Sequence, residues 1–231
     1  MPSLICKPTH KPVQQCSATR PLASSDLKPD VRCSVGFSWI LPLACALLVC
    51  SAGSAAESSR KEPAKWVTLN GCRFMSEEYS DGDSFHVKYG QREFIFRLYF
   101  VDAPETDEHL KDRIREQCQY FGVTRDTITH IGEAAKKFTA EWLRRPFTAT
   151  TRWQNAMGRS RLPRYYALID VNGHDLAELL VSHGLARAKG TVAILPDGTR
   201  AKDHIEKLRK FEAEAKSKQL GIWAHSKAAQ K

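Results

Sequence analysis

Apolar and polar residues alternate along several short runs between residues 66 and 101, and again near residues 147 and 164. In residues 84–89, for example, Phe85 and Val87 share one face, and a Gly-Gln turn follows. Because successive side chains of a strand point to opposite faces of a sheet, such runs predict β-strands. Five strands are predicted, at residues 66–74, 84–89, 93–101, 147–153 and 164–171.

A different pattern, with apolar residues three or four positions apart, predicts a helix in the middle of the chain. Ala135, Phe138 and Trp142 follow this spacing within residues 132–145, and a proline stops the run. Residues 107–131 before it are polar and irregular, which predicts a loop with at most one helical turn.

Two more helices are predicted towards the C-terminus. A short one is expected at residues 175–183, where Gly184 ends it, and a longer one at residues 199–220 with Thr199 as its N-cap. The buried stripe predicted for the longer helix consists of Ile205, Leu208, Phe211 and Ala215. Five short strands with interspersed helices predict an α+β fold that is mainly β, a five-stranded OB-like barrel with about three packed helices.

The N-terminal part of the chain has the pattern of an export signal. Residues 35–49 are continuously apolar, follow Lys28 and Arg32, and precede small residues at 54–56 that resemble an A-x-A cleavage site. A retained membrane anchor is the alternative, but the run is shorter than the roughly 20 residues of a spanning helix. The organisation expected is a leader at 1–56, a linker at 57–65, a folded domain at 66–223 and a flexible tail at 224–231.

Charge and cysteine usage narrow the function only slightly. The formal net charge of +9 favours polyanionic partners, although many soluble proteins are as basic as this. Five of the seven cysteines lie in the leader, so Cys72 and Cys118 would remain after export, either as a disulfide or as two separate thiols. Since no Cys/His spacing suggests zinc, a metal site would have to be built from oxygen ligands.

The candidate chemistry lies in two stretches, residues 81–84 (DGDS) and residues 97–105 (RLYFVDAPE). A hairpin between them would fold the second stretch back beside the first and gather four carboxylates around Arg97. These carboxylates are Asp81, Asp83, Asp102 and Glu105. Several acids need a cation to sit together, and a mid-strand arginine among them suits a phosphate oxygen. This layout predicts metal-assisted cleavage of a phosphodiester, although each stretch alone is more often a turn or a strand end.

The two stretches resemble the staphylococcal nuclease (thermonuclease) family. The similarity continues in family order to the end of the predicted domain, through Gly132-Glu133-Ala134, Arg164 to Ala167, Gly184-Leu185-Ala186 and Gly221-Ile222-Trp223. The resemblance implies a five-stranded OB-like barrel with three helices. It also implies a calcium-dependent nuclease that acts on DNA and RNA.

The resemblance assigns a metal site to the carboxylates. Asp83 and Asp102 match the calcium-ligating aspartates, and Ala103 matches the position whose backbone carbonyl completes the protein ligands. Asp81 matches a nearby acid that supports these ligands without binding the ion itself.

The resemblance also assigns the groups that act on the substrate. Glu105 matches the general base, and Arg97 matches one of two phosphate-binding arginines. Strand register places Arg164 at the second arginine position, whereas the Gly158-Arg159 pair offers Arg159 as a rival. Residues 187–190 lack the tyrosines that line the nucleotide pocket of the staphylococcal enzyme, which concerns base preference more than cleavage.

The function expected from the sequence is an exported, calcium-dependent nuclease, secreted or periplasmic, that does not discriminate between sugars and leaves 3′-phosphate ends. Single-stranded or denatured DNA and RNA are the expected partners, and a monomer without an obligate protein partner is expected. The alternative is a catalytically silent OB-type module that binds nucleic acid without cutting it. The intact set of acids and arginines favours the enzyme.

Overall fold

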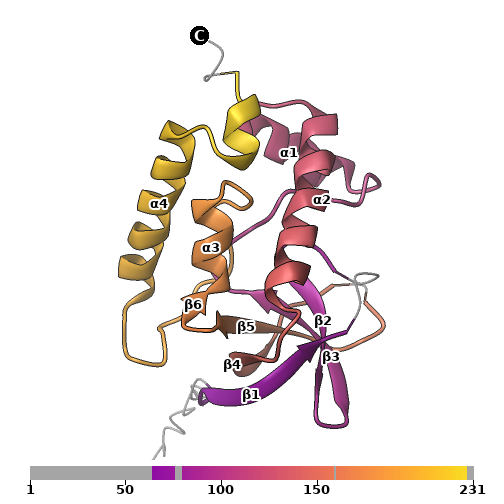
Figure 1. The fold of residues 1–231 in the computed structure, drawn as a ribbon, viewed down its shortest axis with the longest axis vertical. Helices are drawn as coiled ribbons and strands as arrows, with labels where there is room; N and C mark the ends of the chain where they lie inside the picture. The colour runs from indigo at the N-terminus through magenta and orange to yellow at the C-terminus, as the bar shows by residue number, and fades with distance from the viewer. Residues whose placement is uncertain (1–63, 76–79, 159, 228–231) are drawn as a thin grey trace, which may run out of the picture. The chain divides into compact units, whose positions relative to one another are not determined.

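The computed structural model describes residues 64–75, 80–158 and 160–227 of the chain (Figure 1). The predicted leader at 1–56, most of the predicted linker, the end of the predicted tail and Arg159 lie outside the described residues. None of the helices within the described ranges combines the length and the apolar character needed to cross a membrane.

Five strands form a closed barrel, as the alternating pattern predicts (Figure 1). They are β1 (Val67–Phe74), β2 (Ser84–Tyr89), β3 (Arg92–Leu98), β4 (Phe147–Asn155) and β5 (Arg164–Val171). The strand order is β3-β2-β1-β4-β5, and a parallel pairing of β3 with β5 closes the barrel. A two-residue strand, β6 (His174–Asp175), adds to β5 after a turn.

The predicted third strand ends earlier than expected, at Leu98 instead of residue 101. Phe100 has a φ of 69°, so the backbone leaves the extended conformation and the alternation of faces stops. Tyr99 and Phe100 are therefore both buried rather than on opposite faces. The Phe100 amide donates to the carbonyl of Thr191 at 2.9 Å, which ties this bend to a distant loop.

The expectation of a loop at residues 107–131 is wrong, because two helices occupy most of it. Helix α1 (Lys111–Phe121) buries Ile114, Gln117 and Phe121 and ends at Gly122, whose φ is 69°. Its buried face includes a glutamine, so only two apolar residues mark it in the sequence.

Helix α2 (Arg125–Trp142) begins well before residue 132 and ends three residues before the predicted end. The hydroxyl of Thr124 caps it by accepting a hydrogen bond from the Thr127 amide at 3.3 Å. Ile128 and Ile131 extend the buried face that Ala135 begins in the sequence prediction. Helix α2 is therefore one continuous element that reaches back into the predicted loop.

The predicted last helix is also corrected in detail. Helix α4 (Ala201–Ser217) has Arg200 at the N-cap without a side-chain cap bond, so Thr199 does not cap it. Of the predicted stripe, Leu208 and Ala215 are buried, whereas Ile205 and Phe211 are only partly buried. Two polar residues, His204 and Glu212, complete the buried face. A 3₁₀ helix, η1 (Gly221–His225), follows α4.

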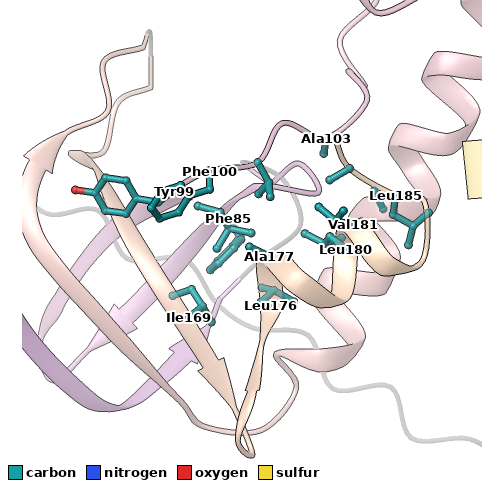
Figure 2. Close-up of a cluster of buried hydrophobic side chains, with 14 of the residues drawn as sticks. Phe85, Tyr99, Phe100, Ala103, Ile169, Leu176, Ala177, Leu180, Val181 and Leu185 are labelled. Atoms are coloured by element: carbon teal, nitrogen blue, oxygen red, sulfur yellow. The ribbon is translucent and has the colours of Figure 1, made fainter. Parts of the chain in front are cut away.

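The remaining helix, α3 (Leu176–Ser182), packs against one end of the barrel (Figure 2). Asp175 caps it by accepting hydrogen bonds from the amides of Ala177 and Glu178 at 2.7 and 3.1 Å. Its buried residues are Leu176, Ala177, Leu180 and Val181. Each leucine and the valine contribute roughly 1.5–3 kcal/mol by leaving water, and the alanine contributes less. This packing fixes the segment after α3, which carries Arg187 into the site described below.

Cys72 and Cys118 are both free thiols, so the structure does not form the disulfide considered above. Cys72 is buried, and burial raises the pKa of its thiol to about 11, which keeps the thiol protonated and unreactive.

Candidate active site

Strand pairing brings the two predicted stretches together. In the β2–β3 hairpin Ser84 pairs with Arg97, and the Leu98 amide donates to the Asp83 carbonyl at 2.9 Å. Asp83 therefore precedes β2 directly beside Arg97, while Asp102 follows the end of β3. The hairpin expected from the sequence accounts for this part of the site.

Arg97 joins the two predicted metal-binding aspartates. Its Nη2 donates to Asp83 Oδ2 at 2.9 Å and to Asp102 Oδ1 at 3.2 Å. The Ala103 amide donates to the same Asp83 oxygen at 3.3 Å. Asp83 is 3% exposed, and burial, together with the charges of Asp102 and Asp81, raises the pKa of its carboxyl despite Arg97. The negative charge at Asp83 is thus only partly compensated.

Asp102 is bound more completely, because both of its oxygens accept hydrogen bonds from cations. Oδ1 accepts from Arg97 and from Nη2 of Arg113 at 2.9 Å. Oδ2 accepts from Nε and Nη2 of Arg187 at 3.0 and 2.7 Å, and from Gln117 at 3.3 Å. Burial opposes ionisation of Asp102, but the charges of Arg113, Arg187 and Arg97 outweigh it and lower the pKa of this carboxyl.

Glu105, the predicted general base, is buried and held from two directions. Arg113 Nε donates to Glu105 Oε2 at 2.6 Å, and the Glu105 amide donates to the side-chain oxygen of Gln117 at 2.9 Å. Burial, followed by the charge of Asp81, raises the pKa of Glu105 even though Arg113 opposes the shift. A raised pKa brings a carboxyl closer to the pH at which it can exchange protons with substrate.

Asp81 lies at the edge of this group. Its carboxylate accepts a hydrogen bond from the hydroxyl of Thr106, and its charge acts on Asp83 and Glu105. Its role as a supporting acid stays a prediction.

Arg164 enters the site from β5, next to β3. Ile95 pairs with Arg164 across the parallel junction of the barrel, and Arg164 Nη2 donates to the Ser84 hydroxyl at 2.5 Å. Within the described part of the chain, its buried Nε has no hydrogen-bond partner. Burial, with the charge of Arg97 added, lowers the pKa of Arg164. The rival Arg159 lies outside the described residues, so the choice of Arg164 stays a prediction.

Sequence reasoning missed three residues that α1 brings to the site. Arg113 and Gln117 donate to Asp102, whereas Glu116 reaches the site by accepting from Arg187. Recognition of the helix at 111–121 would have shown these residues on one face.

Arg187 is the fourth missed residue, and only 2% of its side chain is exposed. It bridges Asp102 and Glu116, and it donates to the two Glu116 oxygens at 2.9 and 2.5 Å. Its guanidinium also lies 4.7 Å from the centre of the Tyr120 ring. The exposed Lys189 binds Glu116 from outside at 2.8 Å.

A cavity of about 720 Å³ opens beside these groups. Its lining includes five basic residues and three acidic ones: Arg97, Arg113, Arg164, Arg187 and Lys189, and Asp102, Asp112 and Glu116. Tyr166 adds an aromatic surface to the same cavity. The combination of several cations and one aromatic ring suits an anionic ligand with planar groups.

The predicted calcium ligands are compatible with a hard cation in donor type and charge. Asp83, Asp102 and the Ala103 carbonyl are all oxygen donors. Burial, and after it the charges of Asp102 and Asp81, raise the pKa of Asp83, and a divalent ion would stabilise its charged form. However, each Asp102 oxygen already accepts from an arginine. A cation that binds Asp102 must therefore replace one of these arginine contacts.

A second acidic group has partners of its own. Ligand atoms of Asp175, Glu178 and His204 lie within 4.8 Å of one another. Asp175 caps α3, however, and Glu178 accepts a hydrogen bond from Lys207 at 2.5 Å. These contacts give both carboxylates a structural role, and the group shares no residue with the predicted metal site.

Comparison with models of protein families gives one match, to the model described as staphylococcal nuclease homologue, over residues 95–225. The matched region is more than half of the chain and runs from β3 to the end of η1. It contains Arg97, Asp102, Glu105 and Arg164, whereas Asp81 and Asp83 precede it.

Proposed function

The chain belongs to the family of staphylococcal nuclease homologues, and on this premise we propose that it is a calcium-dependent nuclease that hydrolyses phosphodiester bonds in DNA and RNA. The observation that carries the proposal is the cavity beside Asp102, where four arginines and Lys189 lie within reach of a polyanion. The buried carboxylates Asp83, Asp102 and Glu105 stand next to it.

Substrate binding would depend on the phosphate backbone rather than on sequence. Arginine forks match pairs of phosphate oxygens, and neither base edges nor the sugar hydroxyl are needed for such contacts. Affinity should therefore fall steeply with salt. Denatured DNA and RNA are the preferred substrates in this proposal, because Tyr166 can stack only on an unpaired base.

Cleavage would join a water oxygen to phosphorus and break the bond to the 5′ oxygen, which leaves a 3′-phosphate. Glu105 would accept the proton of the attacking water, and the departing 5′ oxygen would take a proton from solvent. Arg97 and Arg164 would stabilise the charge that develops on the phosphoryl oxygens. Asp83, Asp102 and the Ala103 carbonyl would hold the calcium ion, which supplies further charge neutralisation at the phosphate.

The proposal is tested by digestion of denatured DNA in the presence of calcium and, separately, of EDTA. Cleavage is expected with calcium only, and Glu105→Gln and Arg97→Ala should each reduce the rate by roughly 10²–10³. No calcium-dependent cleavage, or unaltered rates in both variants, would refute the proposal.

One observation favours the silent binding module as a second candidate. Both Asp102 oxygens and one Glu105 oxygen already accept hydrogen bonds from arginines, so these two acids have cationic partners without a metal ion. A silent module would bind single-stranded DNA equally well in calcium and in EDTA and would release no fragments. A filter-binding assay beside the digestion separates the two functions.

Export and the monomeric state remain proposals. Export rests on the leader pattern at residues 1–56, and the mass of the mature protein recovered outside the cytoplasm would test it. A retained leader in a membrane fraction would support the anchor instead.

A further inference from the structure

The family resemblance assigns no role to Arg113 on α1. However, Arg113 contacts two residues to which the resemblance does assign a role. Its Nη2 donates to Asp102 Oδ1 at 2.9 Å, and its Nε donates to Glu105 Oε2 at 2.6 Å. One guanidinium thus spans a predicted metal ligand and the predicted general base.

The two oxygens of Asp102 differ in how firmly they are held. Oδ2 receives two hydrogen bonds from Arg187, whose side chain is 2% exposed and is also fixed by Glu116. Breaking this contact would leave buried charges unpaired, which is costly. Oδ1 receives Arg97 and Arg113, which line the cavity as Arg187 does. Because the Arg187 contact is the costlier one to break, a cation that enters from the cavity would bind Asp102 through Oδ1.

Of the two arginines at Oδ1, Arg113 is the one that can leave. Its side chain is 46% exposed, whereas that of Arg97 is 17% exposed. Arg97 also binds Asp83, so its departure would release both predicted ligands at once. The half-exposed guanidinium of Arg113 regains water when it leaves, and the arriving ion replaces its positive charge beside Asp102.

We propose that Arg113 is a built-in competitor of the divalent cation: it neutralises Asp102 and Glu105 while no ion is bound and leaves both when an ion arrives. Oδ1 already accepts from Arg97 and Arg113, and a divalent ion would add a third cation to this oxygen, so ion binding and the Arg113 contacts exclude one another. Departure of Arg113 also frees Glu105 to accept a proton. The inference rests on the proposed function, since it takes Asp102 as a metal ligand.

The test is calorimetric titration of the full chain with calcium chloride, without nucleic acid. The forms compared are wild type, Arg113→Ala, Arg113→Gln and Lys111→Ala. Lys111 lies on the same helix and is exposed, and no side-chain contact ties it to the site, so its replacement removes the same charge without touching the carboxylates. Calcium should bind both Arg113 variants about tenfold more tightly or better than wild type, with Lys111→Ala within about twofold of wild type.

Thermal unfolding confirms that each variant is folded, and the glutamine variant retains hydrogen-bonding capacity in case alanine destabilises α1. Calcium affinity that is unchanged or weaker in folded Arg113 variants would overturn the inference. An equal gain in Lys111→Ala, or no calcium binding by any form, would overturn it as well.

Digestion of denatured DNA by the same four forms separates this inference from the proposed function. Tighter calcium binding without cleavage by any form would refute the nuclease and leave the competition standing. Cleavage by wild type together with unchanged affinity in the Arg113 variants would refute the competition alone.

Discussion

The two oxygens of Asp102 face two differently built regions. On the closed side, at Oδ2, Arg187 is buried and shared with Glu116, and Gln117 completes the contacts. On the open side, at Oδ1, Arg97 and the half-exposed Arg113 line the cavity together with Arg164, and Arg187 reaches the same cavity with only 2% of its side chain exposed.

The two sides differ in their role: the closed side holds Asp102 in position, and the open side carries the groups proposed to react. Each charge on the closed side has an opposite partner, which fixes Asp102. Burial opposes ionisation of Asp102, but the charges of Arg113, Arg187 and Arg97, from both sides, lower the pKa of its carboxyl. On the open side burial and neighbouring acids raise the pKa values of Asp83 and Glu105, so charge there is incompletely compensated. Ionisable groups with perturbed pKa values are typical of sites that bind ligands or catalyse reactions.

The largest expected effect is a loss of stability when the arginine contacts of the closed side are removed. Arg187→Ala would leave Asp102 and Glu116 without their shared partner and should lower the free energy of unfolding by about 3–5 kcal/mol. Urea unfolding measures this loss. Lys189→Ala is the matched control, because Lys189 is 56% exposed and binds only the outer edge of Glu116. Its cost should stay below about 1 kcal/mol, and equal losses in both variants would contradict a distinct closed side.

The next largest expected effect is a loss of activity when an arginine of the open side is removed from a protein that stays folded. Arg164→Ala should reduce kcat/KM for denatured DNA by roughly 10²–10³, because a phosphate-binding donor is lost. Arg161→Ala, at an exposed position nearby, should leave the rate unchanged. Arg159→Ala decides between the two candidates for the second arginine. A large loss in Arg159→Ala with none in Arg164→Ala would assign the role to Arg159.

The smallest expected effect is a difference between Asp83 and Asp102 in how each contributes to the free energy of unfolding as the pH changes. The pKa of Asp83 is raised, so its contribution to stability is present below the ordinary value of 3.8 and lost as the pH rises through the folded-state pKa. Asp83→Asn removes this penalty and should stabilise the protein by about 1 kcal/mol at pH 7 but not at pH 3.

Asp102 should behave in the opposite way. Its pKa is lowered, so its contribution is present above 3.8 and lost as the pH falls through the folded-state pKa. Asp102→Asn should destabilise the protein at pH 7, and its deficit should shrink on acidification. Urea unfolding at several pH values measures both variants, and equal pH profiles would contradict the opposite charge balance of the two aspartates.

The open side could be predicted from the sequence to a large extent. Alternation and the turn after residue 89 fix the register of the β2–β3 hairpin, and this register alone places Asp83 beside Arg97. Strand β5 was also predicted with its observed bounds, which puts Arg164 in reach of β3.

The closed side could not be predicted in the same way. Helix α1 buries Gln117 between two apolar residues, so its periodicity is weak in a window that is otherwise charged. Arg187 meets Asp102 across 85 residues of chain, and no local pattern reports such a contact. The bend at Phe100, which ends β3 early, depends on the Thr191 loop and is equally non-local.

Cleavage of an end-labelled, single-stranded oligonucleotide at increasing calcium concentrations tests the central claim most directly. Wild type should release 3′-phosphate products in proportion to calcium occupancy and should give none in EDTA. The Glu105→Gln variant should cleave roughly 10²–10³ times more slowly than wild type. Binding of the oligonucleotide without any product at saturating calcium would contradict the account and identify the protein as a silent member of its family.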